Sequence, residues 1–132
     1  MLNNPLKAYR TVENATLSGR ELEASLLSRS AARLYAVQNN WEDSNREAAL
    51  DEALRYNQKL WTVFQADLME KDNAMPTEIK RNLLTLSVFI DKRTFDVMSF
   101  PDPEKLNILI DINRNIAAGL LNKAPTDEVS MR

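Results

Sequence analysis

The chain has 132 residues, with 17 basic and 19 acidic side chains and a net charge of −2. It contains neither cysteine nor histidine. Disulfide bonds and thiolate metal sites are therefore excluded, and the commonest metal ligand is missing. Two glycines and five prolines leave long uninterrupted stretches, which favours helices over a turn-rich β fold. The length suits one domain with one apolar core.

The basic residues do not gather into the stripe that phosphate binding requires. The nearest candidate is the row of Arg20, Arg29 and Arg33, and it is interrupted by Glu21 and Glu23. Phosphate contacts supply much of the affinity of nucleic-acid-binding proteins. We therefore expect no direct contact with nucleic acid.

The sequence indicates neither a secretory signal nor a membrane span. The segment from Met1 to Arg10 lacks the apolar centre of a signal peptide. The longest uncharged apolar stretch, from Asn82 to Ile90, is far shorter than the ~20 residues that cross a bilayer. We therefore expect a cytoplasmic protein with no membrane insertion.

The N-terminal third predicts a helix that begins near Ser18. The residues from Ser18 to Glu21 have the Ser-x-x-Glu form of a capping box, which satisfies free backbone N–H groups at a helix start. Upstream, Asn4 and Pro5 are suited to cap a short extra helix. The apolar positions of the main helix are Leu22, Leu26, Leu27, Leu34 and Val37, and those of the short one are Leu6, Tyr9 and Val12.

The clearest predicted helix runs from Ser44 to Glu70. Ser44 and Glu47 again have capping-box spacing, and we expect the helix to end near Lys71–Asn73, before Pro76. Its stripe follows alternating steps of four and three residues. The stripe consists of Leu50, Leu54, Asn57, Trp61, Phe64 and Leu68.

Two further helices are predicted after prolines. Pro76 suits a first helical position and Glu78 suits the positive end of the helix dipole; Asp102–Glu104 repeats the pattern before Leu106–Leu121. The first stripe consists of Ile79, Leu83, Leu86, Ile90 and Val97, widened by Phe89 and Phe95. The last helix is apolar on nearly every side, so it is expected to be central or to keep one face for a partner.

Together these elements predict an all-α fold: an antiparallel bundle of four main helices joined by short loops. We expect one domain over residues 1–122 and a disordered tail over residues 123–132.

No catalytic constellation is apparent, so the chain is not expected to be an enzyme. A nucleophilic serine needs a positioned base, usually histidine, and a phosphate loop needs several glycines. Asp67, Glu70 and Asp72 cluster at a helix end, but they lack calcium-loop spacing and are best interpreted as a solvated loop. No cofactor or metal is expected.

Two asparagines lie on apolar stripes. Burying an unpaired amide costs about 1–3 kcal/mol, so Asn57 and Asn113 should each have a hydrogen-bond partner. The structural interpretation, which we favour, is a polar core that sets helix register. The functional interpretation is a polar anchor at the mouth of a binding groove.

The aromatic side chains also have two interpretations, as core residues or as partner contacts. Trp61 and Phe64 are interpreted mainly as core, whereas Trp41, in a predicted loop, is a candidate for exposure. We expect the bundle to leave an apolar groove for a partner helix. The residues expected to bind the partner are Trp61, Leu109, Ile112, Asn113, Arg114, Ile116 and Leu120.

The chain resembles the FlaF family of flagellar biosynthesis regulators. The likeness runs from about Pro5 to Leu121 and rests on an ordered set of segments. Met75 and Asp111 replace the leucine and glutamate of the family pattern, and Thr11–Asn45 matches poorly. The segments are Ala8-Tyr9, Asn57–Trp61, Met75-Pro76, Leu86–Ile90 with Thr94, Leu109–Ile116 and Gly119-Leu120.

This resemblance implies a role in flagellin production. It implies a cytoplasmic flagellin-binding regulator or secretion chaperone, which promotes flagellin synthesis or export by covering the amphipathic terminal helices of flagellin. One alternative is a regulator of flagellin mRNA translation that acts through or against FlbT. Another is a structural adaptor at the flagellar export apparatus. The choice between export and translation, the binding face and the oligomeric state stay open at this point.

Overall fold

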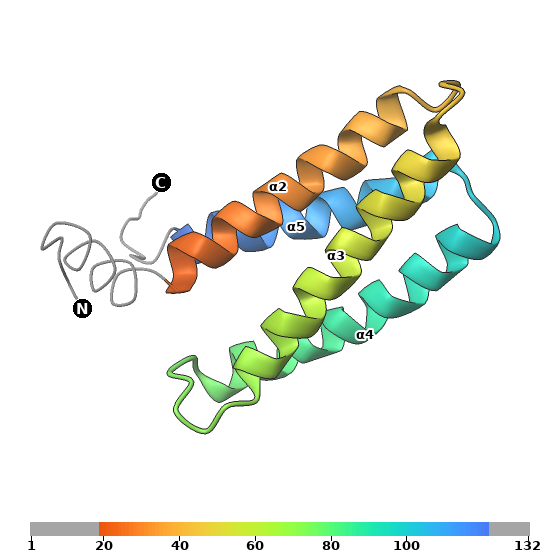
Figure 1. The fold of residues 1–132 in the computed structure, drawn as a ribbon. Helices are drawn as coiled ribbons and strands as arrows, with labels where there is room; N and C mark the ends of the chain where they lie inside the picture. Colours follow the sequence, from red (N-terminus) through yellow and green to blue (C-terminus); the bar gives the residue numbers. More distant parts are fainter. Residues whose placement is uncertain (1–18, 122–132) are drawn as a thin grey trace, which may run out of the picture.

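The computed structural model describes residues 19–121, which form four long helices and one short 3₁₀ turn. The described part contains no strand, so the predicted all-α class is confirmed. The predicted short helix at residues 4–12 and the predicted tail at residues 123–132 lie outside the described residues. Figure 1 shows that consecutive helices run in opposite directions, as in an antiparallel bundle.

Helix α2 spans Gly19–Asn39 and packs more extensively against α5 than against any other helix. Its small buried side chains, Ala24, Ser30 and Ala31, let the two backbones approach closely. Leu27 and Leu34 on the same face are completely enclosed. The small residues of the N-terminal third therefore build the closest helix pair of the molecule.

Helix α3 spans Arg46–Leu68, and its start differs from the prediction. No capping box forms at Ser44, because Asn45 is the N-cap residue and its side chain makes no capping hydrogen bond. Instead Asp43 Oδ1 accepts from the Asn45 backbone N–H at 2.8 Å, which makes a tight turn before the helix. The helix also ends earlier than expected, at Leu68 rather than at Lys71–Asn73.

Helix α4 spans Thr77–Ser99, with Pro76 just outside it as the N-cap residue rather than at the first helical position. The 3₁₀ turn η1 covers Pro103–Lys105 and leads into α5, Leu106–Leu121. Asp102 caps this turn, since its side chain accepts from the Glu104 backbone N–H.

The core lies where α2, α3 and α5 meet, and α4 covers one side of α3 (Figure 1). Helix α4 packs mainly against α3, and its contact with α5 is small. No helix within residues 19–121 has both the length and the apolar composition to cross a membrane. The core consists of Ala24, Leu27, Ala31, Leu34, Val37, Leu50, Ala53, Leu54, Trp61, Phe64, Leu68, Leu83, Ile90, Val97, Leu106, Leu109, Ile110, Ile112, Ala117 and Leu120.

Candidate partner-binding surface

Four buried polar side chains from three helices form one hydrogen-bonded cluster. Asn57 Oδ1 accepts from Ser30 Oγ at 2.8 Å and from Asn113 Nδ2 at 2.7 Å. Trp61 Nε1 donates to Asn113 Oδ1 at 2.9 Å. None of the four side chains is more than 1% exposed. Since a shift of any helix would leave several of these groups unpaired, the cluster sets the register of α2, α3 and α5.

This geometry agrees with the structural interpretation of the two asparagines, a polar core inside the bundle. Asn57 and Asn113 bond to each other and to their neighbours inside the fold, and no groove reaches them. Trp61 also packs edge-on against Phe64, with ring centroids 5.3 Å apart. The two aromatic side chains therefore belong to the same packed centre.

Most of the predicted partner-binding residues are also inside the bundle. Trp61, Leu109 and Asn113 have at most 1% of their surface exposed, so a partner cannot reach them in this conformation. Ile112 and Leu120 are likewise buried, and Ile116 is partly buried against the core. Helix α5 is apolar on many sides because it is central in the bundle. The other explanation, a face kept free for a partner, is not supported for these residues.

The two remaining side chains singled out in the sequence, Arg114 and Trp41, differ in exposure. Arg114 is exposed, with its guanidinium 5.2 Å from the centre of the Tyr35 ring. The expected exposure of Trp41 is wrong, because its ring is partly buried against the core and covered by Arg46 at 4.3 Å. Both arginines make cation–π contacts within the fold.

Helix α4 carries the exposed apolar side chains that the stripe prediction placed inside. Phe95 is 73% exposed, and Ile79 and Phe89 are also open to solvent. They lie beside the buried row of α4 and are not part of it, since one helix, α3, covers α4 along one side. The buried row consists of Leu83, Ser87, Ile90, Thr94 and Val97.

A second row on α4 follows steps of four and three residues along the face next to the buried row. We call this row the α4 stripe. Val88 and Phe95 in it are exposed, and Leu84 and Met98 are partly buried against the core. This spacing is present in the sequence, but the neighbouring buried row has the same period. Spacing alone therefore does not show which of the two rows is exposed. The α4 stripe consists of Thr77, Arg81, Leu84, Val88, Asp91, Phe95 and Met98.

Two shallow depressions adjoin the α4 stripe. One, of about 480 Å³, lies on the first three turns of α4 and has no acidic residue in its lining. It is lined by Thr77, Lys80, Arg81, Leu84, Thr85 and Val88. The other, of about 760 Å³, is a groove between the start of α3 and the end of α4, where Met98 meets Leu50 and Leu54. Its rim carries Arg46, Glu47, Asp51 and Arg55.

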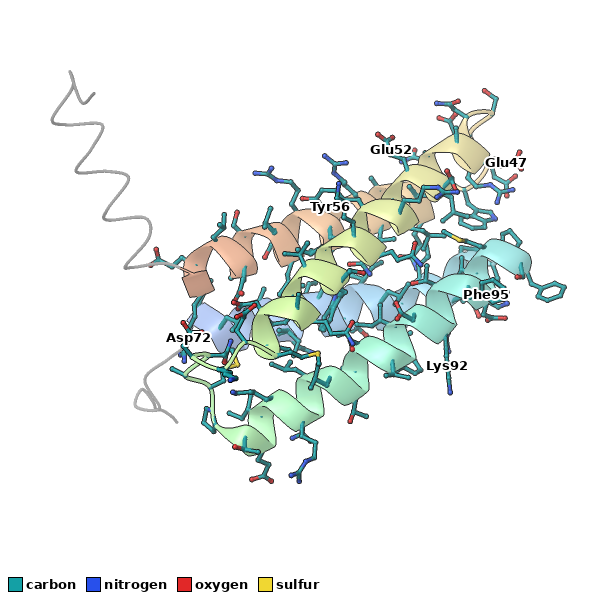
Figure 2. The ribbon with its side chains drawn as sticks, turned by 60° about the horizontal axis from the view of Figure 1, so that its bottom comes forward. Glu47, Glu52, Tyr56, Asp72, Lys92 and Phe95 are labelled. Atoms are coloured by element: carbon teal, nitrogen blue, oxygen red, sulfur yellow. The ribbon has the colours of Figure 1, made fainter. Side chains whose placement is uncertain are left out.

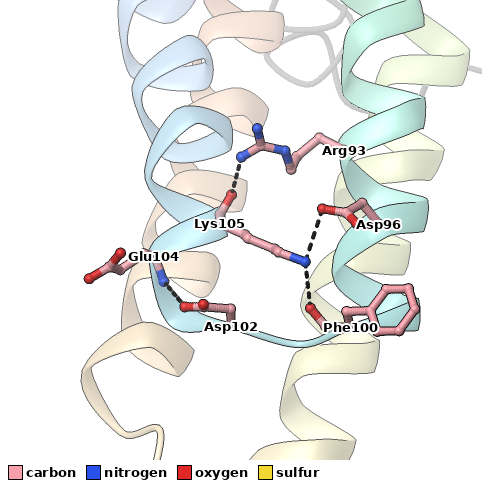
Figure 3. A network of polar contacts seen from close by, with 6 residues as sticks. All are labelled: Arg93, Asp96, Phe100, Asp102, Glu104 and Lys105. Atoms are coloured by element: carbon pink, nitrogen blue, oxygen red, sulfur yellow. Dashed lines mark hydrogen bonds and ion pairs between the residues drawn. The ribbon is translucent and has the colours of Figure 1, made fainter.

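A polar network holds the end of α4 to the start of α5 (Figure 3). Lys105 Nζ forms an ion pair with Asp96 Oδ2 at 3.0 Å and donates to the Phe100 carbonyl oxygen at 2.8 Å. Arg93 Nη1 donates to the Lys105 carbonyl oxygen at 3.1 Å. These contacts fix the groove end of α4 in place.

One titratable group in the described part has a strongly shifted pKa. Glu23 on α2 is half-buried beside Asp67 on α3, and its burial, a hydrogen bond with Asp67 and the charge of Asp67 raise its pKa to about 7. Arg20 opposes this shift. Residues 19–121 contain no group of three or more acidic side chains placed to hold a metal ion.

The chain matches the family described as flagellar protein FlaF over residues 5–120, which is most of its length. The chain belongs to the FlaF family. The comparisons with curated proteins and with solved structures found no match.

Within this FlaF protein, two of the segments that carry the family likeness meet in space. Asn57 and Trp61 come from one segment and Asn113 from the other, and all three share the buried hydrogen bonds described above. The family pattern at these positions is therefore explained by the fold. The surface that meets a partner has to be sought elsewhere, and the α4 stripe is the candidate.

Proposed function

We propose that this FlaF-family protein binds flagellin and promotes its synthesis or export, as a chaperone or regulator in the cytoplasm. Family membership supports a role in flagellum biogenesis. The observation that carries the binding proposal is the α4 stripe, whose apolar positions include the exposed side chains of Val88 and Phe95. Exposed apolar side chains in a row are a typical docking surface for an amphipathic helix.

Flagellin is a suitable partner because its terminal helices are amphipathic and need cover before assembly. A helix laid along α4 would place its apolar side chains on Val88 and Phe95 and reach the groove at Met98. The proposed action is binding and shielding, with no chemical step by the chain itself.

Co-purification with full-length flagellin, followed by titration calorimetry, tests this proposal. We expect a one-to-one complex with a Kd of about a micromolar or tighter, equivalent to roughly −8 kcal/mol. A flagellin that lacks both terminal helical regions serves as the control and should not bind. Absence of binding by intact flagellin at tens of micromolar, roughly −6 to −7 kcal/mol, would refute the proposal.

A further inference from the structure

We propose that the α4 stripe docks an amphipathic helix that carries acidic residues along one edge of its apolar face. This inference rests on the proposed flagellin binding and adds the surface and the charge of the partner helix.

The spacing of the α4 stripe is that of a coiled-coil seam. Steps of four and three residues keep a row facing one neighbour along the whole helix. Helix α4 has 23 residues, so the stripe is long enough, at roughly 34 Å, to accept about six turns of a partner helix. An extended helix therefore fits this surface better than a compact ligand does.

The exposure of the stripe is uneven and places the anchor near one end. Phe95 is 73% exposed and Val88 is 51% exposed, while Leu84 and Met98, which flank them in the stripe, are partly buried. Aromatic side chains that become buried on binding supply much of the affinity of an interface. Phe95, next to the groove at Met98, is therefore the expected anchor.

The charges beside the stripe favour an acidic partner. Arg81 lies in the stripe on its outer side, and Lys92 lies beside the stripe on the same side. Lys80 and Arg81 line the depression that has no acidic residue. Within residues 19–121 none of these three cations forms an ion pair. Asp91 lies toward the opposite edge, and Figure 2 shows Lys92 pointing away from the bundle. Acidic side chains on the partner would pair with this outer edge.

The same charges disfavour a second copy of this chain as the occupant. In a two-fold antiparallel pairing of α4 with itself, each edge of the stripe faces its own copy. The cationic edges with Arg81 and Lys92 would then repel each other. An RNA ligand is also disfavoured, because the stripe between Arg81 and Lys92 carries apolar Leu84 and Val88 and the carboxylate of Asp91, whereas nucleic acids are bound chiefly through phosphates.

A matched pair of phenylalanines tests the position of the surface. Phe95 and Phe100 are nearly equally exposed, at 73% and 71%, but Phe100 lies off the stripe. In the full-length chain, Phe95→Asp should weaken flagellin binding at least about tenfold, whereas Phe100→Asp should leave it within about twofold. Equal melting temperatures would show that both variants fold. Unchanged binding by Phe95→Asp would overturn the inference while leaving the proposed function intact.

Charge reversal tests the chemistry of the partner. The probes are two synthetic helical peptides of about 21 residues with leucine in heptad positions, one flanked by glutamate and one by lysine. The wild-type chain should bind the glutamate peptide about tenfold more tightly, and Arg81→Glu with Lys92→Glu should reverse that preference. The control variant Arg29→Glu, Lys59→Glu changes two exposed positions of α2 and α3 and should keep the wild-type preference for the glutamate peptide.

Three other outcomes also decide the matter. Peptide binding without flagellin binding would refute the proposed function and keep the docking surface. Sedimentation that shows a dimer broken by Phe95→Asp would assign the surface to a second copy and overturn the inference. Binding of an RNA oligonucleotide that is lost in the Arg81→Glu, Lys92→Glu variant, with flagellin binding retained, would overturn it as well.

Discussion

Helices α5 and α4 differ in how the bundle uses their apolar side chains. Helix α5 is the more apolar along its length, but Leu106 and Leu109 are fully enclosed. Helix α5 packs closely along α2 and is hydrogen-bonded to α3 through Asn113. Helix α4 is contacted mainly by α3, and it leaves Val88 and Phe95 exposed. The free surface of a helix therefore depends on how closely its neighbours cover it and not on how apolar it is.

The buried polar groups of the two helices repeat this difference. Asn113 of α5 uses its amide nitrogen and its amide oxygen in hydrogen bonds to α3. Thr94 of α4 is equally buried, but its hydroxyl, like the amide nitrogen of Asn57 in α3, has no partner among the described residues. The contact of α5 with its neighbours is therefore specified by hydrogen bonds, whereas this part of the α4 contact is specified by packing alone.

The largest expected effect is at the centre of the α5 contact. Trp61→Ala should lower the free energy of unfolding by about 3–5 kcal/mol, because it leaves a cavity and an unpaired oxygen on Asn113. Urea unfolding followed by circular dichroism measures this loss. A loss below about 1 kcal/mol would mean that Trp61 is not part of a tightly packed core.

Asn113→Ala should cost roughly 2 kcal/mol, because it removes two hydrogen bonds and leaves Trp61 Nε1 buried without an acceptor. Loss of flagellin binding should be modest. In the double variant Asn57→Ala, Asn113→Ala, the loss of stability should be smaller than the sum of the two single losses, by a coupling energy of about 0.5–3 kcal/mol. Strict additivity would show that the two asparagines do not share a bond in solution.

Thr94→Val gives the opposite sign at the matching position of α4. The substitution removes a buried hydroxyl without a partner and keeps the side-chain shape. It should raise the free energy of unfolding by about 1 kcal/mol, since burial of an unpaired hydroxyl is unfavourable. A destabilised variant in the same urea experiment would show that the hydroxyl is paired, and the contrast with Asn113 would fail.

Glu23 makes the contact of α2 with α3 sensitive to pH. Its pKa in the fold is raised to about 7, from 4.5, chiefly by burial. The folded state therefore holds this proton more tightly than the unfolded state does, and stability falls as pH rises from about 4.5 to about 7. Glu23→Gln should remove this slope.

The measurement is the urea midpoint of both proteins at pH 4 and pH 8. The variant should be more stable than the wild type at pH 8 by about 1 kcal/mol, a value reduced for the solvent screening of a half-exposed carboxyl. At pH 4 the two proteins should be similar. Equal pH profiles would show that the Glu23 carboxyl titrates normally.

The smallest expected effect is at the junction of α4 and α5. Lys105→Met removes the partly exposed ion pair with Asp96 and the hydrogen bond to the Phe100 carbonyl. It should cost about 0.5–1 kcal/mol in unfolding experiments. Hydrogen exchange should speed up at the C-terminal turn of α4 and not in α5, whose start is held by the core. Equal acceleration in both helices would remove the distinction between them.

The amino-acid sequence determined the helices themselves and most of their buried positions. Alternating steps of three and four residues, the prolines at 76 and 103 and the carboxylate at Asp102 are local signals, and each helix formed where they stand. The pairing of Asn57 with a polar partner was also predictable, because a buried amide needs one. The helix ends were less predictable, since side chains such as Asp43 compete for the same backbone groups.

Only the tertiary structure decided which apolar surface stays free. Sequence patterns gave α5 as the partner face, and its residues Leu109 and Ile112 are instead buried in the bundle. The reason is physical: periodicity within one helix shows which side chains share a face, but coverage of that face depends on helices distant in the sequence. Helix α5 packs closely along α2 and is hydrogen-bonded to α3, whereas α4 packs mainly against α3 and leaves Phe95 exposed to solvent.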